Sequence, residues 1–212
     1  MPGRKAPEKD RRKDILRAAY DVAVRQGVEA LTVRAVAGRA AVSHGTVLFH
    51  FDRRDKLIAS LLDRVLDATT GLVDPDGVAS LTTPSERMLA LLRAEMERLS
   101  SDPRHYRLFL EYSALGVRNA VIRRRVSEAL DNYRDAFRAV SDAVVEDARA
   151  TSGQRTPPVT SEGLTAVAVS LVHGCALQAL IEPKTFRLDQ HFDTAARMLE
   201  RMFGRERVRS SR

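Results

Sequence analysis

The sequence contains one cysteine, Cys175, no tryptophan, and few aromatic residues, which make up 5% of its 212 residues. A single cysteine excludes an internal disulfide framework and fits a reducing compartment. With only 11 glycines and 8 prolines, the composition favours helix over sheet. Hydrophobic residues still reach 44% of the chain, which is enough to bury a core and argues against a disordered protein.

Membrane-spanning and secretory segments are not predicted. No run approaches the roughly 20 consecutive apolar residues that a bilayer-spanning helix needs. The amino terminus is basic, but no apolar stretch of signal-peptide type follows it. We therefore expect a cytoplasmic protein with no membrane partner.

Motifs of catalysis and cofactor binding are also missing from the sequence, which has no G-x-G-x-x-G, G-x-x-x-x-G-K-[ST] or G-x-S-x-G. The five histidines, at positions 44, 50, 105, 173 and 191, share no H-x-x-x-H or H-E-x-x-H spacing. His173 and Cys175 are two residues apart, so on a helix they point in different directions and do not predict a metal site. Glu95, Glu97 and Glu111 are interpreted as surface carboxylates rather than as an acid/base pair. We expect no enzyme activity, no metal and no cofactor.

Positive charge is concentrated at one end of the chain. The formal net charge is +7, and residues 1–60 contribute +6 of it, from 13 basic and 7 acidic residues. A local positive field of this kind suits a polyanion, and nucleic acid is the usual one. A solvated basic tail would explain the same charge without any partner, so charge alone leaves both interpretations open.

Helical periodicity runs along most of the sequence, without repeats or alternating strand patterns. We expect an all-α protein of about nine helices: about 9–26, 33–40, a third beginning after residue 43, 54 to about 69, and about 84–99, 103–116, 119–149, 161–181 and 189–203. Gly27 ends the first helix, and Thr32 and Ser43 are placed to cap the second and third. "TPSE" at 83–86 is typical of a capping box. Two short helices about three residues apart predict a helix-turn-helix.

Residues 15–57 resemble the DNA-binding region of the TetR family of transcriptional regulators. The resemblance is carried, without a gap, by "IL" at 15–16, "AA" at 18–19, Gly27, "LTVRAVA" at 31–37, "VSHGT" at 42–46, "HF" at 50–51, Arg54, Asp55 and Leu57. It implies that the segment following Ser43 is a short recognition helix that enters the DNA major groove. Val47 and Phe51 are then expected to pack inward.

The DNA-binding residues that the resemblance and the charge indicate lie at the starts of three predicted helices. They are Thr32 and Arg34, then Ser43, His44, Gly45, Thr46, Leu48, Phe49 and His50, then Arg54 and Lys56. Arg54 matches a phosphate contact of the family. Lys56 and the basic amino-terminal segment, which includes Arg12, are candidates on charge alone.

Two positions depart from the family pattern. Ala41 occupies the turn position where the family usually has glycine, and a left-handed alanine costs roughly 1 kcal/mol there. Leu48 stands where tyrosine is usual. Leucine cannot donate a hydrogen bond to phosphate but can touch a thymine methyl group, so the resemblance does not determine the base preference.

Methionine and aromatic side chains recur at helical spacing in the second half. Core packing is the default explanation for each of them, and the resemblance implies in addition that some surround a cavity for a small-molecule effector. The candidates are Met88, Leu92, Met96, Phe109, Tyr112, Tyr133, Phe137, His173 and Gln178. This lining implies a largely apolar effector, with Tyr112, Tyr133, His173 and Gln178 as polar contacts.

The last two predicted helices carry small residues among large apolar ones, which permits close helix approach. Two such helices from each subunit would make a four-helix interface, so we expect a homodimer. The interface candidates are Val167, Leu171, Gly174, Leu177, Ile181, Phe192, Ala195, Ala196, Leu199 and Phe203. "HGCALQALIEP" at 173–183 also resembles the segment that opens the dimerising helix pair in many family members.

Taken with the resemblance, the sequence predicts four parts: a basic arm at 1–8, a helix-turn-helix DNA-binding domain at 9–53, a ligand-binding and dimerisation domain at 54–204, and a tail at 205–212. The expected function is that of a homodimeric repressor released from a palindromic, double-stranded DNA operator by a small molecule. Two alternatives stay open. One is a small-molecule carrier or enzyme with an incidental basic end, and the other is an architectural DNA-binding protein without a ligand.

Overall fold

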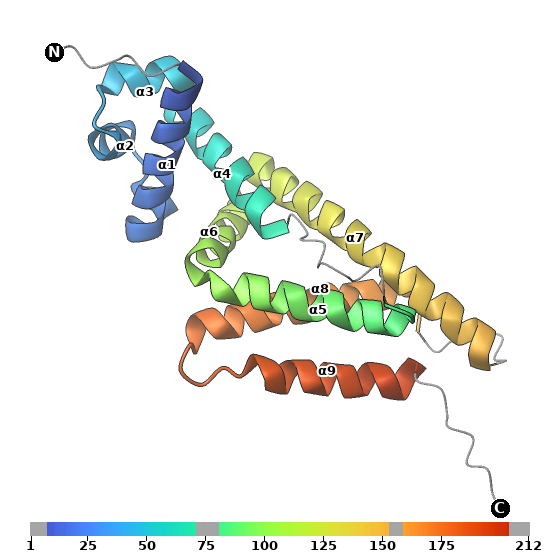
Figure 1. The fold of residues 1–212 in the computed structure, drawn as a ribbon. Helices are drawn as coiled ribbons and strands as arrows, with labels where there is room; N and C mark the ends of the chain where they lie inside the picture. Colours follow the sequence, from blue (N-terminus) through green and yellow to red (C-terminus); the bar gives the residue numbers. More distant parts are fainter. Residues whose placement is uncertain (1–7, 71–80, 153–158, 204–212) are drawn as a thin grey trace, which may run out of the picture. The chain divides into compact units, whose positions relative to one another are not determined.

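The computed structural model describes residues 8–70, 81–152 and 159–203 (Figure 1). Within these residues the chain forms nine α-helices, one short 3-10 helix and no strand, which confirms the all-α prediction. The helices are α1 (Glu8–Gln26), η1 (Val28–Ala30), α2 (Val33–Ala40), α3 (His44–Phe51), α4 (Arg54–Thr70), α5 (Pro84–Ser101), α6 (Pro103–Arg118), α7 (Ala120–Ser152), α8 (Ser161–Ile181) and α9 (Leu188–Phe203). Except for Glu8, the predicted arm and tail lie outside the described residues.

Hydroxyl side chains begin four of the helices by accepting hydrogen bonds from otherwise unpaired backbone amides. Thr32 caps α2 and Thr160 caps α8, with bonds of 3.1 Å to the amides of Ala35 and Gly163. Thr83 and Glu86 form the predicted capping box of α5, since Thr83 Oγ1 accepts from the Glu86 amide at 3.2 Å and Glu86 accepts from the Thr83 amide at 3.0 Å. Ser43 caps α3 in the same way. These local signals explain why most helix starts were predictable.

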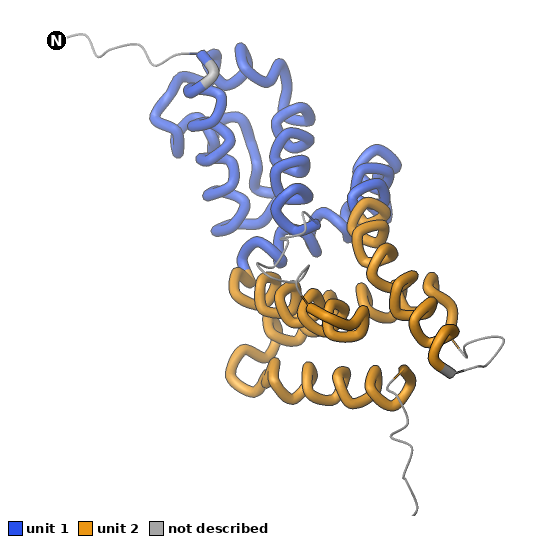
Figure 2. The backbone as a smooth tube through the Cα atoms, turned by 45° about the vertical axis from the view of Figure 1, so that its right-hand side comes forward, with its two compact units in different colours: residues 1–70, 104–129 blue, residues 71–103, 130–212 orange. Residues whose placement is uncertain are grey.

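The described chain divides into two compact units, which Figure 2 distinguishes by colour. Unit 1 combines residues 1–70 with 104–129, and unit 2 combines residues 71–103 with 130–212. The first unit therefore contains α6 and the start of α7 in addition to the predicted helix-turn-helix. The predicted boundary between a DNA-binding and a ligand-binding domain, at residues 53 and 54, concerns function and not compactness, and it stays a prediction.

Unit 1 is built around the first four helices. α1 packs against α2 and α4, and α3 packs against both α2 and α4. Ile15, Val36 and Val47 are buried in this core, and Leu57 and Leu61 of α4 are fully buried beside them. A small apolar core on the inward sides of these four helices therefore holds α3 in place.

Unit 2 is a helical layer in which α5 packs against both α8 and α9, as Figure 1 shows. Met88 and Met96 of α5, Tyr133 and Phe137 of α7, and Val172 of α8 are completely buried. The expectation that no segment is apolar enough to cross a bilayer was wrong for α8, which is long and apolar enough by length and composition alone. Core helices of soluble proteins pass the same test, and 39% of its apolar window is buried here.

Ala41, in the turn between α2 and α3, adopts the left-handed conformation, with φ 53° and ψ 43°. Ala41→Gly is therefore expected to stabilise unit 1 by about 0.5–1 kcal/mol, because relief of the left-handed strain exceeds the entropy that glycine adds to the unfolded chain. Urea denaturation monitored by circular dichroism would measure this gain. Ala40→Gly, one residue earlier and inside the helix, is the matched control and should destabilise; equal effects at both positions would contradict the strain argument.

Candidate nucleic-acid interface and effector site

The start of α3 is held by two short side chains. Ser43 Oγ accepts a hydrogen bond from the Thr46 amide at 3.0 Å, and the two hydroxyl oxygens lie 2.8 Å apart. Val47 and Phe51 are buried, which confirms their predicted inward packing. Ser43 is exposed and Thr46 is half-buried, so both hydroxyl groups remain on the outward side of the helix. α3 therefore presents a polar amino-terminal end on an apolar base.

The outward side of α3 combines small, aromatic and imidazole groups. His44 and Gly45 are exposed, and Leu48 and His50 are half-buried. A side chain at Gly45 would meet only Ser43 Oγ, at 3.8 Å, so the protein's own packing does not require glycine there. Phe49 is 74% exposed. Open space at a glycine next to an exposed aromatic ring suits close approach by a large partner.

The amino end of α2 offers a second polar surface. Thr32 is exposed while it caps the helix, and Arg34 is exposed in the first turn. The unpaired amides of a helix amino terminus carry partial positive charge, which favours a phosphate group. Lys56, near the start of α4, is exposed as well.

Two arginines that were predicted to contact DNA, Arg54 from the resemblance and Arg12 from its charge, form contacts within unit 1. Arg54 donates from Nε to the carbonyl of Leu31 at 2.5 Å and from Nη2 to the carbonyl of Glu29 at 3.3 Å. Arg12 lies over the Phe51 ring, 4.8 Å from its centroid, and donates to Ser60 Oγ at 3.1 Å. Arg12 thus supports the end of α3 rather than extending from the protein as part of an arm. Arg54 keeps further donors, so its phosphate contact stays a prediction.

A shallow groove of about 490 Å³ lies between α1 and α4 in unit 1. It is lined by Arg12, Ser60, Asp63, Arg64, Asp67 and Ala68. None of the predicted effector residues lines it. Its mixed charges offer neither an apolar lining nor a field of one sign.

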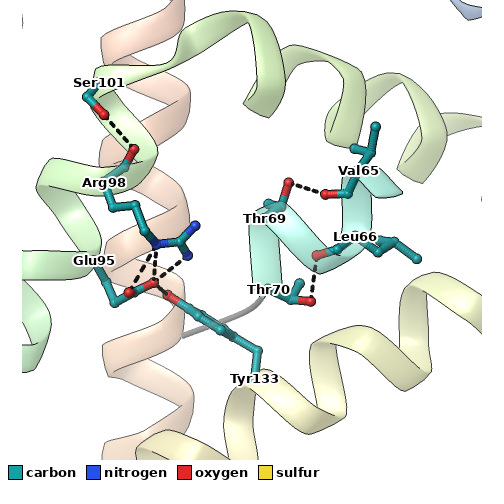
Figure 3. A network of polar contacts seen from close by, with 8 residues as sticks. All are labelled: Val65, Leu66, Thr69, Thr70, Glu95, Arg98, Ser101 and Tyr133. Atoms are coloured by element: carbon teal, nitrogen blue, oxygen red, sulfur yellow. Dashed lines mark hydrogen bonds and ion pairs between the residues drawn. The ribbon is translucent and has the colours of Figure 1, made fainter. Parts of the chain in front are cut away.

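Unit 2 encloses a polar cluster, formed by Glu95, Arg98, Tyr133 and His173. Figure 3 shows the Tyr133 hydroxyl and the Arg98 guanidinium meeting on the Glu95 carboxylate; Tyr133 donates at 2.9 Å and Arg98 Nη2 at 2.5 Å. The His173 ring packs edge-on to the Tyr133 ring with centroids 5.6 Å apart, and Phe137 packs on Tyr133 at 5.3 Å. Burial, reinforced by the Glu95 charge, raises the pKa of Tyr133, which keeps its hydroxyl protonated as the donor.

The interpretation of Glu95 as a surface carboxylate was wrong, because its side chain is fully buried. Its position in the sequence contained the signal: Met88, Leu92 and Leu99 are buried on the same helix at spacings of three or four residues, and Glu95 falls on that stripe. A charged residue on an apolar stripe requires a partner, and Arg98 lies one turn further along the helix. Sequence reasoning missed both members of this pair.

The structure brings only some of the predicted effector residues together. Met88, Leu92, Met96, Tyr133, Phe137 and His173 belong to unit 2, where all but the half-buried His173 are buried. Phe109 and Tyr112 are buried in unit 1, where Tyr112 donates to the carbonyl of Ile58 at 3.3 Å. Gln178 is exposed, and its Oε1 lies 3.2 Å from His191 Nε2. Their assignment to one effector cavity stays a prediction.

His173 is kept neutral by its surroundings. Burial, followed by the positive charges of Arg98 and Arg134, lowers the pKa of His173 to about 4, and the Glu95 charge acts in the opposite direction. The neutral ring is therefore the form that packs against Tyr133 at neutral pH.

Acidification from pH 7 to pH 4 is expected to destabilise the wild type by up to about 3 kcal/mol more than His173→Gln. The unfolded chain takes up a proton at its ordinary pKa near 6.5, whereas the folded chain does so only near 4. Stability is therefore lost as the pH falls through this window and levels off below it. Urea midpoints measured at fixed protein concentration over this pH range give the difference. If the stability of the two proteins depends on pH in the same way, His173 is not held neutral in the fold.

The predicted dimerisation helices expose apolar side chains. Val167 is 65% and Ile181 68% exposed, and Leu177 is also exposed. Leu171, Gly174, Phe192, Ala195, Ala196 and Phe203 are half-buried, while Leu199 is buried inside unit 2. Met198 and Met202 of α9 are exposed as well, and neither was among the predicted interface residues. α8 and α9 thus leave large apolar groups in water in the isolated chain.

Two family models match the sequence. The model of "Bacterial regulatory proteins, tetR family" matches residues 15–61, and that of "BetI-type transcriptional repressor, C-terminal" matches residues 84–204, more than half of the chain.

Individual proteins are also similar to this chain, in sequence or in fold. The HTH-type transcriptional repressor KstR of Mycobacterium tuberculosis is 36% identical over 94 residues, which are 43% of this chain and 42% of that protein. The chain spans about a third to a half of the length of the curated relatives it matches. A putative transcriptional regulator from Pseudomonas aeruginosa PAO1 has a similar structure, with a TM-score of 0.70, 21% identity, and coverage of 94% of this chain and 96% of that one. The regulator FadR from Bacillus subtilis, solved with stearoyl-CoA, has a TM-score of 0.63 at 15% identity, with coverage of 91% and 98%.

Proposed function

The chain belongs to the TetR family of bacterial regulatory proteins, and we propose that it is a DNA-binding transcriptional regulator and not an enzyme. In this proposal it acts in the cytoplasm as a homodimeric repressor. It binds a palindromic operator through α2 and α3 and leaves it when a small molecule binds to the second half of the chain. The observation that carries the proposal is the exposed polar end of α3, held on a buried apolar base directly after the turn from α2.

The DNA contacts follow from the surfaces of unit 1. His44, Gly45, Thr46 and Phe49 of α3 meet base edges and sugars in the major groove, and Thr32 at the amino end of α2 meets a phosphate. Ser43, Leu48 and His50 complete the α3 contact, and Arg34, Arg54 and Lys56 add positive charge around it. The local excess of positive charge over residues 1–60 supplies the sequence-independent part of the affinity.

Dimerisation follows from the exposed apolar residues of α8 and α9. Val167, Leu177 and Ile181 of α8 and Met198 and Met202 of α9 are large apolar groups that a second copy would remove from water. A two-fold interface places the two recognition helices on successive major grooves, about 34–36 Å apart. An operator with two inverted half-sites at that spacing is the expected target.

The effector acts by binding one spacing of the two recognition helices better than the other. A tenfold loss of operator affinity needs only about 1.4 kcal/mol of such coupling. The Met and aromatic groups of unit 2 favour a molecule with a large apolar part, and the structural neighbour FadR was solved with stearoyl-CoA, which joins an apolar acyl chain to a polar head. The Glu95–Arg98–Tyr133–His173 cluster supplies polar groups for its head.

Selection of bound sequences from random double-stranded DNA at low salt tests the proposal. An enriched palindrome is the expected result. No binding would favour the carrier or enzyme alternative, and binding without sequence preference would favour an architectural protein. A thermal-shift screen of apolar and cationic metabolites, repeated on the operator complex, tests the switch: compounds that stabilise the protein should release the DNA, and stabilisation without release would overturn the repressor mechanism.

A further inference from the structure

α6 makes three polar contacts with the last two turns of α1 and the start of η1, all within unit 1. His105 Nδ1 lies 3.0 Å from the Tyr20 hydroxyl. Arg107 donates a hydrogen bond from Nη2 to the carbonyl of Val24, and Glu111 Oε2 accepts one from the Val28 amide at 2.8 Å. These contacts join α6 to residues that lie more than 80 positions earlier in the sequence.

The two charged residues match the helix ends that they meet. Val24 lies in the last turn of α1, where unpaired carbonyls carry partial negative charge, and the cationic Arg107 binds there. Val28 is the first residue of η1, where unpaired amides carry partial positive charge, and the anionic Glu111 binds there. Gly27, the single residue between the end of α1 and the start of η1, has φ 87° and provides no side-chain cap of its own. Glu111 supplies from α6 an acceptor for the first amide of η1.

The other end of η1 is fixed from a different helix. Arg54 at the start of α4 donates to the carbonyls of Glu29 and Leu31. The 3-10 helix is therefore capped at its amide end by α6 and at its carbonyl end by α4. Its last residue is followed by the fully buried Leu31 and then by Thr32, the N-cap of α2. No flexible linker separates this doubly capped turn from the amino end of α2.

We propose that Arg107 and Glu111 of α6 are positioning residues for DNA binding: by capping the two helix ends on either side of Gly27, they hold the amino end of α2 in place for a phosphate. The inference rests on the proposed DNA-binding function and adds α6 to the elements that control it. Neither residue touches DNA; both act through the backbone of residues 24–32. The ion pair between them, 3.3 Å from Arg107 Nε to Glu111 Oε1, keeps the two charges in register one helical turn apart.

The test compares four variants of the full-length protein on the selected operator, by fluorescence anisotropy at several salt concentrations. Glu111→Ala is expected to weaken binding about tenfold, the effect of a lost helix cap, and to reduce the salt dependence by about one phosphate contact. Glu111→Gln should recover most of the affinity, because its amide oxygen still accepts from the Val28 amide. Glu128→Ala is the matched control, since it removes the exposed i,i+4 partner of Arg124 in the same unit and should change nothing.

The exchanged double variant Arg107→Glu, Glu111→Arg distinguishes capping of the two helix ends from stabilisation by the Arg107–Glu111 ion pair alone. It keeps two opposite charges four residues apart but presents the wrong sign to each helix end, so it should bind at least as weakly as Glu111→Ala. Wild-type operator affinity in Glu111→Ala or in the exchanged double variant would overturn the proposal. So would a weakened Glu111→Ala with an unchanged salt dependence, which would indicate general destabilisation.

Hydrogen exchange at the Val28 amide distinguishes failure of this inference from failure of the proposed function. Exchange should accelerate in Glu111→Ala and not in Glu128→Ala, whether or not DNA is bound. If the wild type selects no operator, the DNA-binding function is wrong while this amide still reports the contact. If the wild type binds its operator and the Val28 amide exchanges equally fast in both variants, the positioning role is wrong and the DNA-binding function stands.

Discussion

Gly174→Arg is expected to yield folded monomers that bind the operator at least about 100-fold more weakly than the wild type, because a dimer engages two half-sites at once. Gly174 lies in α8, and beyond its neighbouring residues and the backbone of its own helix no atom lies within 4 Å of where a side chain would begin, so the isolated chain has room for the arginine. Replacing a helical glycine also removes a helix-propensity cost of about 1 kcal/mol. The charge becomes buried and unpaired only when a second copy packs on α8.

Light scattering at micromolar concentration measures the change, and operator binding by the same samples measures its consequence. Gly38→Arg is the matched control for assembly, since Gly38 is also helical and also has open space around it but lies on α2 in unit 1. This control should stay dimeric. A wild type that is monomeric at micromolar concentration, or a Gly174→Arg protein that remains dimeric, would remove α8 from the interface.

His44→Ala combined with Thr46→Ala is expected to lower operator affinity by more than about 2 kcal/mol, roughly 30-fold or more, since each contact to a base edge contributes about 1–3 kcal/mol. The start of α3 should survive the change, because the Thr46 amide still donates to Ser43 Oγ. The two residues are neighbours on one helix, so their effects need not add.

The control for base recognition is Arg34→Ala. Arg34 is exposed in the first turn of α2 and is proposed to meet phosphate, so its loss should weaken all sequences alike and reduce the salt dependence by about one contact. The double variant should instead reduce the difference between operator and random DNA. If the double variant retains the wild-type preference for its operator, α3 is not the reading helix.

The helix-turn-helix was predictable because its signals are local. Thr32 and Ser43 cap their helices with hydrogen bonds that reach only three residues along the chain, and Val47 and Phe51 follow the helical period into the core. The left-handed Ala41 was equally foreseeable from its place in the turn. The 3-10 helix at 28–30 was not predicted, since one turn of three residues leaves no periodic pattern.

The partners of the charged residues were the part that the sequence did not reveal. Arg12 and Arg54 were both predicted to contact DNA, Arg12 on charge alone and Arg54 because it matches a phosphate contact of the family. In the structure their guanidinium groups bind Ser60 and Phe51 in one case and backbone carbonyls in the other. Glu111, which the sequence suggested was a plain surface carboxylate, caps a helix 83 residues away.

The sequence by itself determined the family, the all-α architecture and the face of α3 that is exposed, because caps, turns and helical periodicity act over a few residues. Tertiary structure alone decided which distant groups meet: Glu111 with Val28, Arg54 with Leu31, and Tyr133 with Glu95, at separations of 83, 23 and 38 residues. Helix packing sets these contacts, and one residue's rotation about a helix axis, roughly 100°, would direct each side chain elsewhere. A pattern that repeats every 3.6 residues states which side of a helix is buried, but it does not state which partner lies on that side.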